Sequence, residues 1–165
     1  MIRNIVFTVL LAIIAGILQS TLIGRIALFN VVPDLALCIL VYSAYVNGTM
    51  TGQISGFFSG LLRDLISSPP LGLNSLIRTL IGAITGIFKG ALFLDYFFMP
   101  VFLCAAATII KAVFYLFLRL FLGQAIPFYS FTTSLFWIEV GLNALSAPLL
   151  FLILRQIKYI SPKRR

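Results

Sequence analysis

Long apolar stretches, separated by short polar or Gly/Pro breaks, run along almost the whole chain. A membrane-spanning helix needs roughly 20 mostly apolar residues, and a chain of 165 residues has room for about six short-looped helices of that kind. The predicted spans cover residues 4–23, 31–46, 51–66, 71–88, 97–122 and 131–157. Helix-breaking pairs such as Asn47-Gly48 and Pro69-Pro70 separate neighbouring spans. The pattern predicts an all-α, polytopic integral membrane protein with one transmembrane domain, residues 1–165.

Small and polar residues recur every four positions in the third and fourth predicted spans. The members of the two stripes are Gly52, Gly56, Gly60 and Asp64, then Asn74, Arg78, Gly82 and Gly86. Residues four apart lie on one face of a helix, and small residues there let two helices approach closely in lipid. The stripes predict a packing surface, either between these two spans or for another protein's transmembrane helix.

Composition agrees with a lipid environment. Hydrophobic residues make up 61% of the chain and charged residues 10%, against about 45–50% and about 25% in soluble domains. Basic residues flank the predicted inner ends: Arg3, Lys89, Arg155, Lys158, Lys163, Arg164 and Arg165. The positive-inside rule therefore predicts that both termini are cytoplasmic. No aromatic-interleaved basic domain is present, so a nucleic-acid partner is not expected.

Charged residues also gather near the predicted outer ends of the helices. They are Asp34, Arg63, Asp64, Arg78, Arg119 and Glu139. An unpaired charge at the bilayer centre costs about 2.5–3.5 kcal/mol, so we expect mutual pairing or a hydrated concavity. Arg63 and Arg119 can extend toward the interface, whereas Arg78 and Glu139 are predicted to pair across the fourth and sixth spans. Lys111, near the middle of the fifth span, receives no partner in this scheme.

Few residues suited to catalysis are present. The chain has no histidine, which removes the usual imidazole base and most zinc sites. Cys38 and Cys104 stand singly in two spans and are expected to be small buried hydrophobes. No glycine-rich phosphate loop occurs, and the four acids are too scattered for a magnesium site. We therefore predict no catalytic, cofactor or metal site, and a protein that is not an enzyme.

Three segments carry a resemblance to a known family. They are Pro33-Asp34 before an apolar span, Gly60-Leu61-Leu62-Arg63-Asp64-Leu65 ending the glycine-rich span, and Pro70-Leu71-Gly72-Leu73-Asn74 opening the next. Together they resemble the rod shape-determining protein MreD family. The resemblance implies a multi-pass scaffold in the bacterial cytoplasmic (inner) membrane, within the machinery for cell elongation and lateral peptidoglycan synthesis.

The resemblance also implies partners. MreC is the closest, followed by the glycosyltransferase RodA and a class B penicillin-binding protein, with the MreB filament as an indirect partner and membrane lipid around all of them. The candidate partner-binding or structural residues are Pro33, Asp34, Gly52, Gly56, Gly60, Asp64, Pro70, Gly72, Asn74, Arg78, Gly82, Gly86 and Glu139. Arg63 departs from the apolar residue expected before Asp64, which leaves open whether Asp64 is held by its neighbour or kept for a partner.

A second interpretation comes from another class of protein. Substrate-binding subunits of energy-coupling-factor vitamin transporters are also small, basic, six-helix membrane proteins. Ala12 and Gly16 have the small-residue spacing that such subunits use for docking. The predicted outer loops are very short, however, and Trp137 is the single indole available for stacking. Both features favour the scaffold over the solute-binding subunit.

Overall fold

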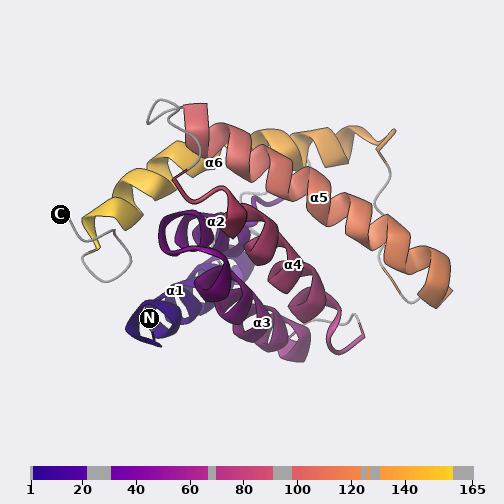
Figure 1. Cartoon of the computed structure of the whole chain (residues 1–165). Coiled ribbons are helices and arrows are strands. Elements are labelled where there is room, and N and C mark those ends of the chain that lie inside the picture. Colours follow the sequence, from indigo (N-terminus) through magenta and orange to yellow (C-terminus); the bar gives the residue numbers. More distant parts are fainter. Residues whose placement is uncertain are drawn as a thin grey trace.

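The computed structural model describes residues 2–21, 31–66, 70–90, 98–123, 126 and 131–157. Six helices form within these residues: α1 (Ile2–Thr21), α2 (Leu35–Asn47), α3 (Thr49–Ile66), α4 (Leu73–Ile87), α5 (Phe98–Leu122) and α6 (Ser134–Gln156). Each corresponds to one predicted span, so the all-helical prediction is confirmed. Figure 1 shows α5 and α6 packed along each other on one side of the group formed by α1 to α4.

The helices differ in their capacity to cross a membrane. α1, α5 and α6 are long and apolar enough to do so. α2 has 13 residues and α4 has 15, which at 1.5 Å per residue gives about 20 and about 22 Å, less than the roughly 30 Å of a hydrocarbon core. Three candidate spans are therefore found among the described residues, and six crossings with both termini inside stay a prediction. Lys158, Lys163, Arg164 and Arg165, on which the orientation partly rests, lie outside these residues.

The short helix α2 forms the centre of the bundle. Its sequence is hydrophobic on all sides, as expected of a helix without a solvent or lipid face. The nine consecutive residues from Ala36 to Ala44 are buried, and α2 packs against every other helix. The helix begins at Leu35 and not near residue 31 as predicted, because the Asp34 carboxylate accepts a hydrogen bond from the Leu37 backbone N–H and caps the first turn.

The glycine stripes of α3 and α4 lie against each other in an antiparallel hairpin. A Cβ atom built on Gly52 would overlap the Gly82 carbonyl, and one built on Gly82 would overlap the Gly52 carbonyl. Gly56 meets the Arg78 carbonyl group in the same way. Two further contacts are of the same kind, Gly60 with Asn74 and Ser75, and Gly86 with Thr49. The absence of side chains thus lets the backbones of α3 and α4 touch within this chain.

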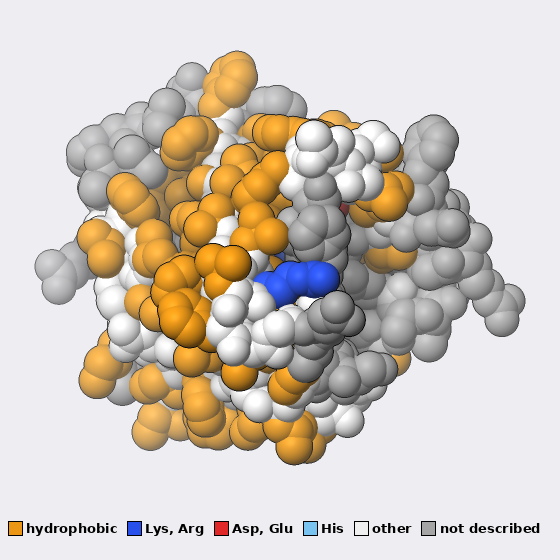
Figure 2. Space-filling model, turned by 90° about the vertical axis from the view of Figure 1, so that its right-hand side faces the viewer, with side chains coloured by type: hydrophobic (Ala, Val, Ile, Leu, Met, Phe, Trp, Pro, Cys, Tyr) orange, Lys and Arg blue, Asp and Glu red, His pale blue; other side chains and the backbone are white. Residues whose placement is uncertain are grey.

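Hydrophobic side chains cover much of the exterior (Figure 2). On α1, Val6, Leu10, Ile14 and Ile17 are all exposed and recur at helical spacing. α5 likewise exposes Phe102 among other large apolar residues. Exposed apolar surface of this extent is suited to lipid or to neighbouring membrane helices.

The predicted orientation can be checked by labelling single cysteines in intact cells. Leu71, just before α4, and Gln156, at the end of α6, are both exposed. In a background with Cys38→Ala and Cys104→Ala, Leu71→Cys should react with an impermeant thiol reagent and Gln156→Cys should not. Both should react after permeabilisation. Labelling of Gln156→Cys in intact cells would contradict the prediction that the C-terminus is cytoplasmic.

The helix contact between α3 and α4 can be checked with alanine substitutions. Gly56→Ala should lower the free energy of unfolding by about 1–3 kcal/mol, because its methyl group must displace the α4 backbone. Gly141 lies inside α6 with open space around a built Cβ, so Gly141→Ala should be neutral or stabilising. Thermal unfolding in detergent measures both. Equal stability of the two variants would contradict the contact.

Candidate functional site

Asp34 lies at the centre of a buried cluster of charged residues. Its carboxylate accepts hydrogen bonds from Arg78 Nη2 at 3.0 and 3.3 Å and from Lys111 Nζ at 3.4 Å. Arg63 Nη1 lies 3.5 Å from Asp34 Oδ1. One buried carboxylate therefore faces three cations, and its Oδ1 also accepts a hydrogen bond from the Leu37 backbone N–H of α2.

Lys111 extends the cluster to α6. Its ammonium group donates to Glu139 Oε1 at 2.5 Å as well as to Asp34. The predicted direct pair of Arg78 with Glu139 is wrong, because Arg78 pairs with Asp34 and Glu139 pairs with Lys111. The physical reason is the position of Asp34, which is buried at the first turn of α2 within reach of both Arg78 and Lys111.

Each charged residue of this cluster comes from a different part of the chain. Asp34 caps α2, and α3, α4, α5 and α6 supply Arg63, Arg78, Lys111 and Glu139 in turn. Positive and negative groups alternate from Arg78 through Asp34 and Lys111 to Glu139. Such alternation offsets the cost of burial that any one of these charges would carry alone. The cluster joins five helices and leaves out α1.

Asn143 supports the cluster from α6. Its side-chain oxygen accepts a hydrogen bond from the Asp34 backbone N–H at 2.6 Å, and its side-chain nitrogen donates to Thr108 at 2.9 Å. Asn143 is fully buried. The sequence interpretation missed this residue, although it lies four positions after Glu139 and therefore on the same helix face.

A similar signal was present on α5. Cys104, Thr108, Lys111 and Tyr115 recur at spacings of four, three and four and are all buried. This spacing forms a polar stripe on one face of a mostly apolar helix. The stripe indicates that Lys111 faces the interior of the bundle.

Asp64 serves a different purpose from Asp34. Its carboxylate accepts hydrogen bonds from the backbone N–H groups of Gly72, Asn74 and Ser75, each at 3.0 Å, and from the Asn74 side chain at 2.9 Å. These donors belong to the first turn of α4, where N–H groups have no helical partner and a negative charge is favourable. Asp64 is thus held by the start of α4. The sequence left open whether its neighbour Arg63 or another protein would engage this carboxylate.

The turn before α4 depends on its small residues. Gly72 adopts a left-handed conformation with φ +94°, which glycine accommodates without strain. Pro70 is exposed, and its carbonyl accepts from Leu73 N–H at 3.2 Å. The Asn74 side-chain oxygen accepts from the Tyr115 hydroxyl at 2.8 Å. This turn therefore connects α3, α4 and α5.

The other residues singled out in the sequence make local contacts within the bundle. Pro33 precedes the cap of α2, and its carbonyl accepts from Leu35 N–H at 3.0 Å. Arg119, expected to extend toward the interface, donates to the Ile126 carbonyl at 3.2 Å. Cys38 and Cys104 are both buried, as expected, and the Cys38 thiol donates to the Asn143 carbonyl at 3.9 Å. Among the described residues, no group of acidic or cysteine side chains is arranged to hold a metal ion.

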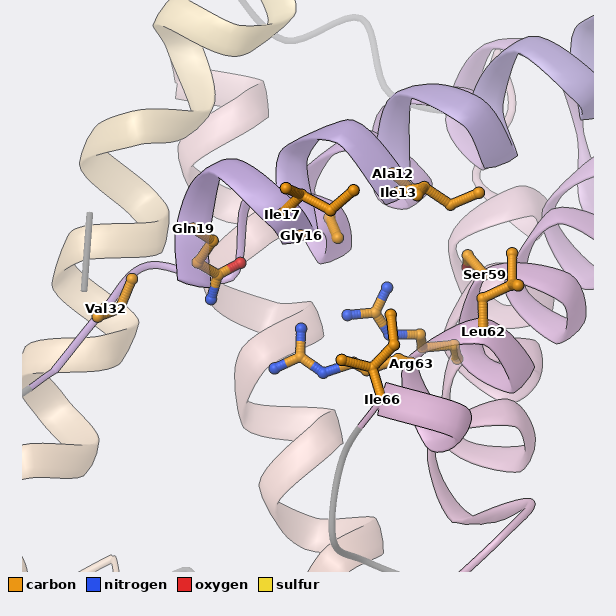
Figure 3. Close-up of a pocket in the computed structure, with 12 residues that line it drawn as sticks. Ala12, Ile13, Gly16, Ile17, Gln19, Val32, Ser59, Leu62, Arg63 and Ile66 are labelled. Carbon is orange, nitrogen blue, oxygen red and sulfur yellow. The ribbon is translucent and has the colours of Figure 1, made fainter. Parts of the chain in front are cut away.

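A cavity of about 340 Å³ lies beside the charged cluster. Gly16 and Ile17 of α1 face Leu62, Arg63 and Ile66 of α3 across it (Figure 3). Arg78 also contributes to its lining. The cavity therefore has mainly apolar walls with two guanidinium groups.

Comparison with known families assigns the chain. The family model described as rod shape-determining protein MreD matches residues 1–157. The chain belongs to the MreD family. No curated protein and no solved structure matches it significantly.

The family match confirms the resemblance drawn from the sequence. MreD-family proteins are membrane proteins with a structural role in determining rod shape. Within the described part of this MreD-family chain, three helices are long and apolar enough to cross a membrane. The residues that carried the resemblance, around Asp34 and Asp64, are those that cap α2 and α4 in the structure.

The buried cluster predicts unequal effects of its two carboxylates on stability. Asp34→Asn should lower the free energy of unfolding by about 3–5 kcal/mol, because it leaves buried cations without their shared counter-ion. Glu139→Gln should cost less, since Glu139 faces one cation and is partly exposed. Thermal or denaturant unfolding in detergent measures both changes.

A double-mutant cycle serves as the control. Lys111→Gln and Glu139→Gln should show a coupling energy of about 0.5–3 kcal/mol, whereas Arg78→Gln and Glu139→Gln should show a smaller one. A larger coupling energy for Arg78 with Glu139 than for Lys111 with Glu139 would instead support the pair predicted from the sequence.

Proposed function

We propose that this chain is a non-enzymatic membrane scaffold of the bacterial cell-elongation machinery, which binds MreC and helps to position the peptidoglycan synthase. The family match over residues 1–157 carries the proposal, because that family determines rod shape. RodA and a class B penicillin-binding protein would be the synthase components, and MreB an indirect partner. The location would be the bacterial cytoplasmic membrane.

The arrangement of polar and apolar groups supports a binding role. The charged residues from five parts of the chain bond to one another in the interior. The exterior of α1 and α5 instead presents large apolar side chains. A partner helix would therefore associate mainly through close packing over area, since single polar contacts between membrane helices are worth only about 0.6 kcal/mol on average.

The glycine stripes constrain where MreC binds. Gly52, Gly56 and Gly82 are occupied by the contact of α3 with α4. We therefore place the partner helix on an exposed apolar face and assign the glycines an indirect part, through the folding of the hairpin. Asp34 and Asp64 would act in the same indirect way, by fixing the helix ends that shape this face.

The alternative, a solute-binding subunit of an energy-coupling-factor transporter, draws support from the cavity between α1 and α3. A volume of about 340 Å³ is at the lower end of the range of about 300–1,000 Å³ seen for small-molecule pockets. Such a subunit would associate with an ATPase-linked transporter module and would not affect cell shape.

Co-purification tests the two functions against each other. The tagged full-length chain, extracted from its own membrane in mild detergent, should retain MreC, and depletion of the chain should turn rod-shaped cells round. Retention of an ATPase-linked transporter module without MreC would overturn the scaffold proposal and favour the solute-binding subunit.

A variant with a defined structural lesion sharpens this experiment. Gly56→Leu should reduce both the membrane abundance of the chain and the recovery of MreC, because the added side chain collides with α4. Gly141→Leu, which meets open space, should keep normal abundance. If Gly56→Leu kept normal abundance but lost MreC, the stripe itself would be the partner surface.

A further inference from the structure

The cavity between α1 and α3 is bordered by exposed apolar side chains. Ile17 on α1 is 53% exposed and Ile66 on α3 is 77% exposed, and both line the cavity. Figure 3 shows them on opposite sides of it. Exposed apolar surface of this kind suits the acyl chains of a lipid.

The lining of the cavity carries positive charge. Arg63 and Arg78 both line it, and the Arg63 side chain is 35% exposed. Among the described residues, the cluster around Asp34 contains three cations and two carboxylates. Asp64 is engaged by the first turn of α4, and Asp95 lies outside the described residues. The site therefore has electrostatic complementarity to an anion.

A further polar group lines the same cavity. The side-chain oxygen of Gln19 is buried and accepts no hydrogen bond from the described residues. Buried acceptors of this kind are normally satisfied. A headgroup that carries a hydroxyl or amine donor beside its phosphate would supply the missing hydrogen bond.

We propose that this cavity binds the phosphate-bearing headgroup of an anionic membrane phospholipid. The phosphate lies against the guanidinium groups of Arg63 and Arg78, a geometry for which arginine is well suited. The headgroup donor reaches Gln19, and the acyl chains leave between Ile17 and Ile66. A volume of about 340 Å³ accommodates a headgroup and leaves the chains in the bilayer.

Lipid retention tests the proposal without any assay of cell shape. The full chain is reconstituted in nanodiscs with equal parts of phosphatidylglycerol and phosphatidylcholine, extracted in mild detergent, and its bound lipids are counted by native mass spectrometry. The wild-type chain should retain phosphatidylglycerol in preference to phosphatidylcholine. Gly16→Leu, which fills the cavity without changing any charge, should keep the phosphate away from the arginines and so reduce this preference about tenfold, which corresponds to about one charge-assisted hydrogen bond between the lipid and the protein.

Matched variants separate binding from folding. Arg63→Gln should reduce the preference as Gly16→Leu does, while Arg119→Gln, a change of equal charge outside the cavity lining, should leave it intact. Gly141→Leu is the control for Gly16→Leu, since both positions have open space around a built Cβ. If Arg63→Gln fails to fold, the lipid preference of Gly16→Leu decides whether the cavity is the binding site.

Three outcomes would overturn the proposal. The first is equal retention of the two lipids by the wild-type chain. The second is an unchanged preference in folded Gly16→Leu. The third is displacement of the retained lipid by inorganic phosphate alone, which would make the ligand a free anion. Loss of lipid binding would leave the scaffold proposal untouched, because that proposal is judged by recovery of MreC.

Discussion

The Asp34 carboxylate is the interaction on which the rest of the bundle depends. It closes the first turn of α2 through Leu37 N–H and at the same time neutralises Arg78 and Lys111. A buried ion pair can often be replaced as a whole by apolar residues at little cost, whereas removal of one partner leaves a buried charge uncompensated. Removal of the Asp34 carboxylate would uncap the central helix and take away the counter-ion that cations of three neighbouring helices share. Helix position and charge balance are therefore coupled through one residue.

The glycine contact between α3 and α4 brings the cations to that carboxylate. Arg63 and Arg78 lie on the two helices of the hairpin, and the contact of Gly56 with the Arg78 backbone fixes their relative height. Asp64 secures the same register from the end of the hairpin by binding the first turn of α4. Close backbone packing supplies the geometry, and the ion pairs then make any other register costly.

Sequence reasoning identified the helices and the gathering of charges but not the pairings. The lengths of the apolar stretches and the Gly/Pro breaks between them locate six helices to within a few residues. Which acid pairs with which base depends on the position of each helix along the axis of the bundle. That position is set by tertiary packing. The predicted scheme placed Asp34 at the outer end of its span and Lys111 near the middle of another, whereas in the structure their side chains meet. Asn143 was missed because a buried amide resembles any other isolated polar residue until its helix face is compared with Glu139.

The distribution of polar groups separates α1 from the other five helices. It contributes no charge to the cluster, and among the described residues two side-chain hydrogen bonds join its N-terminal half to α2, Thr8 with Ser43 at 2.7 Å and Asn4 with Asn47 at 2.6 Å. Its C-terminal half borders the cavity, where Gly16 has no heavy atom within reach of a built Cβ. The same half of α1 is nevertheless packed, because Ala12 and Ala15 are buried and Ala15 belongs to an apolar cluster with Ile39, Tyr42 and Leu154. The cavity therefore does not come from a detached helix: it exists because Gly16 has no side chain where α1 faces α3.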